Sequence, residues 1–98
     1  MNQYIIRSIT NIWGNEIYFE IAIKVTKDKT AKDIISLGEI AYWVEGSSIA
    51  IGFGPTPISK ADEIRLVTKA NIIGKTKSNL SSLVMVNSGE IVIVERMD

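Results

Sequence analysis

The sequence predicts a mainly β fold, a small barrel or sandwich, and three observations favour this class. Residues 16–25 alternate between two sets of side chains, as a strand with one wet and one buried face requires. Isoleucine, whose branched side chain suits a pleated sheet, supplies about a fifth of the 98 residues. Short apolar runs also recur between turn-forming residues such as Gly38 and Gly46. We expect one domain over residues 1–98.

The N-terminal apolar run is compatible with two elements. Residues 4–12 carry apolar side chains at spacings of three and four, which predicts one face of a short helix, although their isoleucines also suit a strand. Gly14-Asn15 then predicts a turn into the strand at 16–25. In that strand Phe19 belongs to the face expected to be buried, whereas Glu16 and Glu20 belong to the wet face.

The remainder of the chain predicts further short strands separated by turns. Residues 39–44 and 48–53 predict a hairpin around Glu45-Gly46-Ser47. The other expected elements, in chain order, are one helical turn or an irregular connection at 31–37, two short strands or one bulged strand over 64–67 and 70–75, a helical turn at 79–83 with Asn79 near its cap, and a buried strand at 90–95.

Composition narrows the classes of partner. The formal net charge is +0 and the basic residues are scattered, so the broad positive field of a nucleic-acid binder is missing. No apolar run approaches the roughly 20 residues of a membrane span, and no signal peptide is recognised. The absence of cysteine excludes disulfides and suits a cytoplasmic location. High isoleucine and lysine contents point towards a thermophile.

Two partial motifs fail on their spacing. Gly52-Phe53-Gly54 begins like a dinucleotide-binding fingerprint, but Pro57 stands where the third glycine is needed. Gly74-Lys75-Thr76 resembles the end of a phosphate-binding loop, but Lys69 stands where the earlier glycine is needed. The chain has no histidine or cysteine, which removes the usual zinc ligands and the base of serine–histidine catalysis. We therefore expect no cofactor and no metal.

A carboxylate pair is the acid–base arrangement that remains. Glu16 and Glu20 fall on one face of the strand at 16–25. The ordinary exposure of glutamate favours two solubilising charges over a catalytic pair.

A rigid corner follows the strand at 48–53. Its sequence, Gly52-Phe53-Gly54-Pro55-Thr56-Pro57, holds both prolines of the chain, each with a fixed φ and no N–H to donate. A rigid loop that carries an aromatic ring is a place where binding sites are built. The aromatic residues Trp13, Tyr42, Trp43 and Phe53 also cluster near expected strand ends and turns, where they would line a cleft or pack in the core.

An ordered set of segments resembles a known family. The segments are Trp13-Gly14-Asn15-Glu16-Ile17-Tyr18-Phe19, Gly38-Glu39-Ile40-Ala41-Tyr42-Trp43, Phe53-Gly54-Pro55-Thr56-Pro57, Asp62-Glu63-Ile64-Arg65 and Asn71-Ile72-Ile73-Gly74-Lys75. They resemble small prokaryotic cyclophilin-like proteins, a family known by its fold and without an assigned activity. The resemblance implies a small cyclophilin-like β-barrel, similar to the barrel of prolyl isomerases, with one or two short helical turns.

The chain departs from the family pattern in two places. The family usually has a strand hairpin and a helix before the Trp-Gly turn, whereas here residues 1–12 precede Trp13. It often has Trp-Pro-Pro-Gly where this chain has Trp43-Val44-Glu45-Gly46, and Pro-Ala-Ser where it has Leu66-Val67-Thr68. Because missing strands would leave unpaired edges, we expect an open barrel or one completed by a homo-oligomer. A start site placed too late is the rival explanation.

Three functions remain open on these grounds. The leading one is a binding module for an extended peptide or a small apolar ligand, in a cleft lined by Trp13, Tyr42, Trp43 and Phe53 and edged by Pro57 and Arg65. The resemblance also raises prolyl cis–trans isomerisation, for which Arg65 is the plausible donor to the amide. The third is a structural subunit whose aromatic residues all serve the core and an interface.

Overall fold

The computed structural model describes residues 5–76 and 80–95, and its chain is mainly β. The strands are β1 (Ile5–Ile9), β2 (Asn11–Trp13), β3 (Glu16–Glu20), β4 (Lys32–Ile35), β5 (Glu39–Trp43), β6 (Ser48–Gly52), β7 (Ile64–Lys75) and β8 (Ile91–Glu95). A single 3₁₀ turn, η1 (Leu80–Met85), stands among these described elements.

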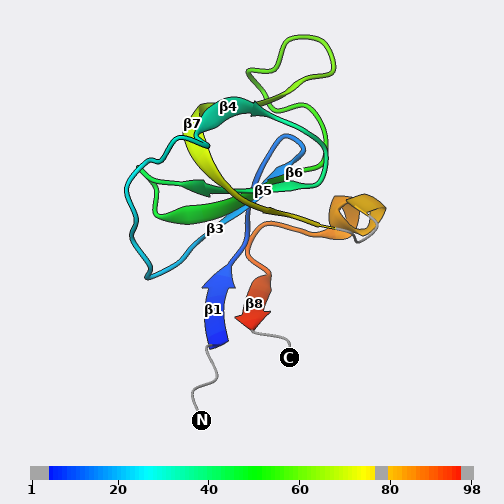
Figure 1. Cartoon of the computed structure of the whole chain (residues 1–98). Helices are drawn as coiled ribbons and strands as arrows, with labels where there is room; N and C mark the ends of the chain where they lie inside the picture. Colours follow the sequence, from blue (N-terminus) through cyan, green and yellow to red (C-terminus); the bar gives the residue numbers. More distant parts are fainter. Residues whose placement is uncertain (1–4, 77–79, 96–98) are drawn as a thin grey trace.

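Six strands form a curved sheet and two form a separate ribbon. The sheet order is β2-β3-β6-β5-β7-β4, and β1 pairs with β8. β7 is long enough to pair with β5 through its second half and with β4 through its first, so the sheet curls over itself (Figure 1). β2 and β4 lie at the two ends of this order and do not pair with each other, so the described sheet stays open. The expected open form of the barrel is thus confirmed.

The curved sheet has an apolar cluster on each face. On the concave face Ile35, Ala41, Ile64, Leu66 and Ala70 are buried together. On the other face Ile17, Phe19, Ile21 and Tyr42 are buried, and side chains from β1, β8 and η1 pack against them. Phe19 is therefore in the core, as its alternating neighbours predict.

The N-terminal run forms strands, so its helical interpretation is wrong. Residues 5–9 pair with β8, whereas residues 11–13 pair with β3. Between them Thr10 is buried, and its Oγ1 donates to the carbonyl oxygen of Asn87 at 2.8 Å. The isoleucines adopt a strand because distant segments supply the pairing partners, which local spacing does not reveal.

The strand expected at 16–25 ends at Glu20 instead. β3 pairs with β6, and the pair ends at Glu20 opposite Ser48, because the chain before Ser48 turns at Ser47 with a φ of 47°. Ile23 and Val25 are exposed rather than buried. The following loop is held by the buried side chain of Asn71, which accepts from the N–H of Asp28 at 2.9 Å and donates to the carbonyl of Thr26 at 2.9 Å.

Of the remaining expected elements, the hairpin, the bulged strand and the helical turn are present, whereas residues 32–35 differ from the expectation. The hairpin of β5 and β6 is confirmed, and β7 is one bulged strand rather than two. Residues 32–35 form β4, where a helical turn or an irregular connection was expected. The helical turn exists as η1, while the expected cap, Asn79, lies outside the described residues.

The last strand, β8, is half exposed, although a buried strand was expected there. Ile91 is 75% exposed and Ile93 is 53% exposed. Opposite residues of an antiparallel pair share a face, so Ile5, Arg7 and Ile9 lie on the same side as Ile91, Ile93 and Glu95. The other face of the ribbon, with Ile6, Val92 and Val94, packs against the sheet, so this face stays open.

Candidate functional site

A pocket of about 240 Å³ opens on the concave face of the curved sheet. Five strands supply its walls: β2, β3, β5, β6 and β7. The lining residues are Trp13, Glu16, Tyr18, Trp43, Ala50, Leu66, Val67, Thr68 and Ala70. We call this the aromatic pocket.

Strand register brings these side chains to one face. Trp13 lies opposite Glu16 across β2 and β3, and Tyr18 lies opposite Ala50 across β3 and β6. Opposite residues and residues two apart along a strand point to the same side of a sheet. Ala50 and Ala70 are buried and have side chains of one carbon, which leaves space between the larger rings.

The indole of Trp43 is fixed from three directions. Its Nε1 donates to Thr68 Oγ1 at 3.0 Å, and its ring meets that of Tyr18 edge to face, with centroids 6.1 Å apart. Gly46 lies against the ring so closely that a Cβ there would stand 2.2 Å from Trp43 Cε3. Thr68 in turn donates to Glu45 Oε1 at 3.1 Å. The ring is thus held before any ligand arrives.

Glu16 places a buried carboxyl in this apolar wall. Its residue is 6% exposed, and its Oε1 has no hydrogen-bond partner among the described residues. Glu16 lies opposite Gly52 in the β3–β6 pair. Ile64 packs closely against Gly52, since a Cβ added to this glycine would stand 2.5 Å from Ile64 Cγ2. Burial in these surroundings raises the pKa of Glu16 from 4.5 to about 7. The expectation that Glu16 is a solvated charge is therefore wrong.

Comparison with known proteins assigns the fold to a family. A sequence model described as cyclophilin-like matches residues 1–95. The chain belongs to the cyclophilin-like family. The solution structure of a hypothetical protein from Archaeoglobus fulgidus is similar to it, with 40% identity and a TM-score of 0.74 over 93% of this chain and 68% of that chain. No curated protein matches this cyclophilin-like chain.

Two of the six predicted site residues meet in the aromatic pocket. Trp13 and Trp43 line it. Tyr42 is 3% exposed on the opposite face, where its hydroxyl donates to the carbonyl of Ile23 at 2.6 Å. Phe53 packs against the same cluster as Tyr42. Neighbouring residues of a strand point to opposite faces, so Tyr42 and Trp43 are separated although they adjoin in sequence.

The segment at residues 52–57, which we call the proline corner, packs against the turn at Gly14-Asn15. Pro57 is exposed, and its Cδ would stand 2.9 Å from a Cβ at Gly14, which has a φ of 58°. Asn15 N–H donates to the carbonyl of Pro55 at 2.9 Å, and Phe53 N–H donates to the carbonyl of Asn15 at 2.8 Å. The corner thus holds the turn that carries Trp13 and Glu16, and a glycine is needed at that turn.

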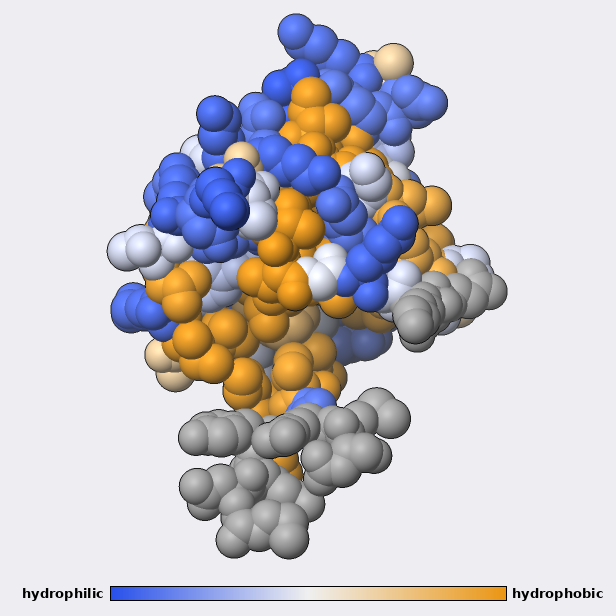
Figure 2. All heavy atoms as spheres, in the orientation of Figure 1, coloured by the Kyte–Doolittle hydropathy of each residue, from blue (hydrophilic) through white to orange (hydrophobic). Residues whose placement is uncertain are grey.

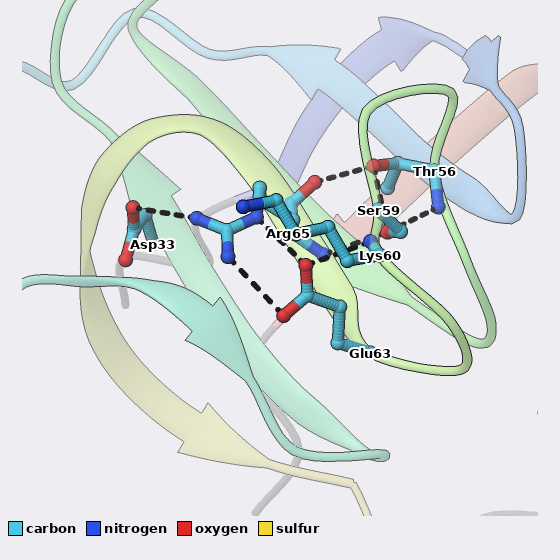
Figure 3. A network of polar contacts seen from close by, with 6 residues as sticks. All are labelled: Asp33, Thr56, Ser59, Lys60, Glu63 and Arg65. Atoms are coloured by element: carbon cyan, nitrogen blue, oxygen red, sulfur yellow. Dashed lines mark hydrogen bonds and ion pairs between the residues drawn. The ribbon is translucent and has the colours of Figure 1, made fainter.

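Arg65 belongs to a polar network at the start of β7 (Figure 3). Its Nε donates to Glu63 Oε1 at 2.8 Å, and its Nη1 lies 3.5 Å from Asp33 Oδ2. The hydrogen bond from Arg65 holds the pKa of Glu63 below its usual value. Buried Thr56 donates to the carbonyl of Arg65, which ties the proline corner to the strand. The guanidinium is engaged by carboxylates and does not line the aromatic pocket.

Glu16 and Tyr18 line the pocket although the sequence reasoning did not select them for a ligand site. The signal that finds them is the two-residue turn Gly14-Asn15, because such a turn sets the flanking residues Trp13 and Glu16 opposite each other. Tyr18 then follows on the same face.

The described residues hold neither a cluster suited to a metal ion nor a helix suited to a membrane span. Over residues 5–76 and 80–95, no three His, Cys, Asp or Glu side chains are grouped so as to hold a metal ion. In the same ranges, no helix has the length and apolar character needed to span a membrane.

Proposed function

We propose that this cyclophilin-like protein is a binding module and that the aromatic pocket is its ligand site. The observation that supports this proposal is the concave, largely apolar site built from Trp13, Tyr18 and Trp43, with one buried carboxyl among them. Apolar walls with a few placed polar groups are the usual character of a small-molecule site.

The size of the pocket narrows its occupant. Sites for drug-sized ligands measure about 300–1,000 Å³, and this pocket, at about 240 Å³, falls below that range. A small molecule or one side chain of an extended peptide suits the space better than a large cofactor. Because the ring of Trp43 is already held in place, less conformational entropy is lost when a ligand binds.

The isomerase and purely structural alternatives receive less support. Prolyl isomerisation required Arg65 as a donor to the amide, and that guanidinium is held by Glu63 and Asp33. A purely structural role for the aromatic residues does not explain why Ala50 and Ala70 leave an open pocket between the rings.

The test is a fragment screen on the ¹⁵N-labelled protein. A panel of small alcohols, amines and blocked amino-acid amides is titrated while the indole N–H signals of Trp13 and Trp43 are followed. Binding predicts that one class of fragment shifts both signals, and that Trp43→Ala abolishes the shift of Trp13. Phe53→Leu, on the other face, is the control and should leave fragment binding intact.

Two results would contradict this proposal. One is a panel in which no fragment moves either indole signal. The other is a loss of about 3–5 kcal/mol in Trp43→Ala, the size expected when a core tryptophan is truncated, without any effect on ligand binding.

We also propose that the protein forms a homodimer through the outer face of the β1–β8 ribbon. Four isoleucines are exposed there, Ile5, Ile9, Ile91 and Ile93, beside Arg7 and Glu95. Figure 2 shows apolar side chains running down the molecule towards this end, whereas hydrophilic ones cover the upper part. Arg7 and Glu95 carry opposite charges on this face, so a two-fold arrangement can pair Arg7 of one copy with Glu95 of the other.

Sedimentation velocity at micromolar concentration tests the dimer. Ile93→Lys on the outer face should yield a folded monomer, whereas Lys69→Ala on β7 should leave the dimer intact. A monomeric wild-type protein would overturn this part of the proposal.

We also propose a cytoplasmic location, because the chain has no cysteine.

A further inference from the structure

Glu16 puts a carboxyl group in the wall of the aromatic pocket, and a purely apolar ligand would give this group no partner. A carboxyl group in such surroundings is costly unless a partner pairs with it. Its Oε1 is buried and lacks a partner among the described residues, in a side chain that is 6% exposed. A hydrophobic side chain at this position would pack without that cost, so the carboxyl points to a ligand that pairs with it.

The charges around Glu16 restrict the chemistry of that ligand. None of the nine lining residues is lysine or arginine, and the one other titratable group is the phenol of Tyr18. From β2 the pocket receives an indole, from β5 a second indole, from β6 a methyl group, and from β7 apolar side chains and the hydroxyl of Thr68. Behind Thr68, Glu45 is already paired with Lys27 at 2.6 Å. Among the described residues, the pocket walls therefore supply no positive charge for Glu16.

The aromatic rings favour the same sign of charge. The faces of tryptophan and tyrosine rings carry partial negative charge and attract cations within about 6 Å. Trp13 lies opposite Glu16, Tyr18 follows two residues later on the same face, and Trp43 meets Tyr18 edge to face. Three rings and a carboxylate at one small cavity suit a cation with an apolar stem. An anion would meet repulsion from Glu16.

Building on the proposed function, we propose that the aromatic pocket binds an alkylammonium group. Its N–H donates to the carboxylate of Glu16, and its carbon chain packs against Trp13, Tyr18 and Trp43. The group can come from a free amine or from the side chain of a lysine in an extended peptide. The two sources share this chemistry and are separated by the experiment.

The experiment compares ligands that differ in charge alone. n-Butylammonium and n-butanol have similar size and shape, and the same relation holds for the blocked amides of lysine and norleucine. Each is titrated into the full chain while the indole N–H signals of Trp13 and Trp43 are followed at pH 8. We expect the ammonium ligands to bind at least about tenfold tighter than their neutral partners. Tighter binding of the lysine amide than of n-butylammonium assigns the site to peptides, and the reverse order assigns it to free amines.

Glu16→Gln is the matched variant, since it removes the charge and keeps the shape. We expect it to abolish the preference for the ammonium ligand, whereas Glu20→Gln, an exposed position on the same strand, should keep it. In the wild type the preference should fall between pH 8 and pH 5.5, because Glu16 gains a proton while the ammonium ligand, like lysine, stays charged. This pH series decides the matter even if Glu16→Gln does not fold.

The outcomes separate the inference from the proposed function. Equal affinity for n-butylammonium and n-butanol would overturn the inference and leave the binding function standing. A preference that survives Glu16→Gln, or one that does not change with pH, would also overturn it. If none of the ligands moves the indole signals, both proposals fail.

Discussion

Glu16 lies directly opposite Trp13 across the β2–β3 pair, so a buried carboxyl and an indole ring share one wall of the aromatic pocket. The two-residue turn Gly14-Asn15 sets this relationship, and the proline corner holds the turn in place. The local geometry of the site therefore follows from two segments that are about 40 residues apart in the sequence.

The buried carboxyl of Glu16 should make stability depend on pH near neutrality. Its pKa is about 7 in the folded chain and near 4.5 when unfolded, so the folded state holds a proton that the unfolded state releases. Stability is then highest below pH 4.5 for this group and falls as the pH rises to about 7, by up to about 3 kcal/mol. Urea unfolding of the wild type and Glu16→Gln at pH 5 and pH 8 measures the difference.

Glu20→Gln is the control for that measurement. It lies on the same strand but is exposed, so it should keep the wild-type pH dependence. The carboxyls of Glu39 and Glu63 have lowered pKa values, so their contribution to stability is lost as the pH falls below 4.5. That range lies below the pH range in which Glu16 titrates. A Glu16→Gln variant with the same pH dependence as the wild type would contradict the prediction.

Gly46→Ala should disturb the aromatic pocket without touching its lining. The added Cβ would stand 2.2 Å from Trp43 Cε3, so the indole must move and lose its hydrogen bond to Thr68. We expect a loss of about 1–3 kcal/mol in stability, together with a shifted Trp43 indole N–H signal.

Gly74→Ala is the matched control for the Gly46 substitution. A Cβ at Gly74 meets nothing within 4 Å, and the residue lies in an extended strand. It should change stability by less than about 0.5 kcal/mol and leave both indole signals in place. Equal effects of the two alanines would show that the contact with Trp43 does not matter.

Asn71→Ala should loosen the loop between β3 and β4. The Asn71 side chain is buried and bonds the backbone of Thr26 and Asp28, so its removal leaves a donor and an acceptor unpaired. We expect a loss of about 2–4 kcal/mol and faster amide exchange at Asp28. Asn11→Ala, whose contacts are exposed and 3.5 Å long, should cost much less. Unchanged exchange at Asp28 would refute this role.

Arg65→Ala should have a small effect on both stability and binding. The guanidinium is partly exposed and bridges Glu63 and Asp33, and solvent-screened pairs of this kind contribute little to stability. Because it lies outside the aromatic pocket, the affinity for a pocket ligand should change less than about twofold. Titration of the variant with the same ligand checks this, and a large loss of affinity would reinstate Arg65 as a site residue.

Local patterns in the sequence were sufficient for the class of fold and for several elements. The alternation over residues 16–25 predicted a strand, of which residues 16–20 form β3. The turn at Glu45-Gly46-Ser47 predicted the hairpin, and the ordered family segments predicted the cyclophilin-like fold. The same patterns selected Trp13 and Trp43, which line the pocket. These features depend on neighbouring residues and on backbone preferences, so they can be read along the chain.

The sequence by itself determined a mainly β, cyclophilin-like chain with aromatic residues at its strand ends. Only the tertiary structure decided which face each residue joined. It set Tyr42 in the core and Trp43 in the pocket, turned residues 5–9 into a strand by pairing them with β8, and buried Glu16 in an apolar wall. The physical reason is that pairing and burial depend on segments far apart in the chain, whereas a sequence pattern describes only each segment's own preference.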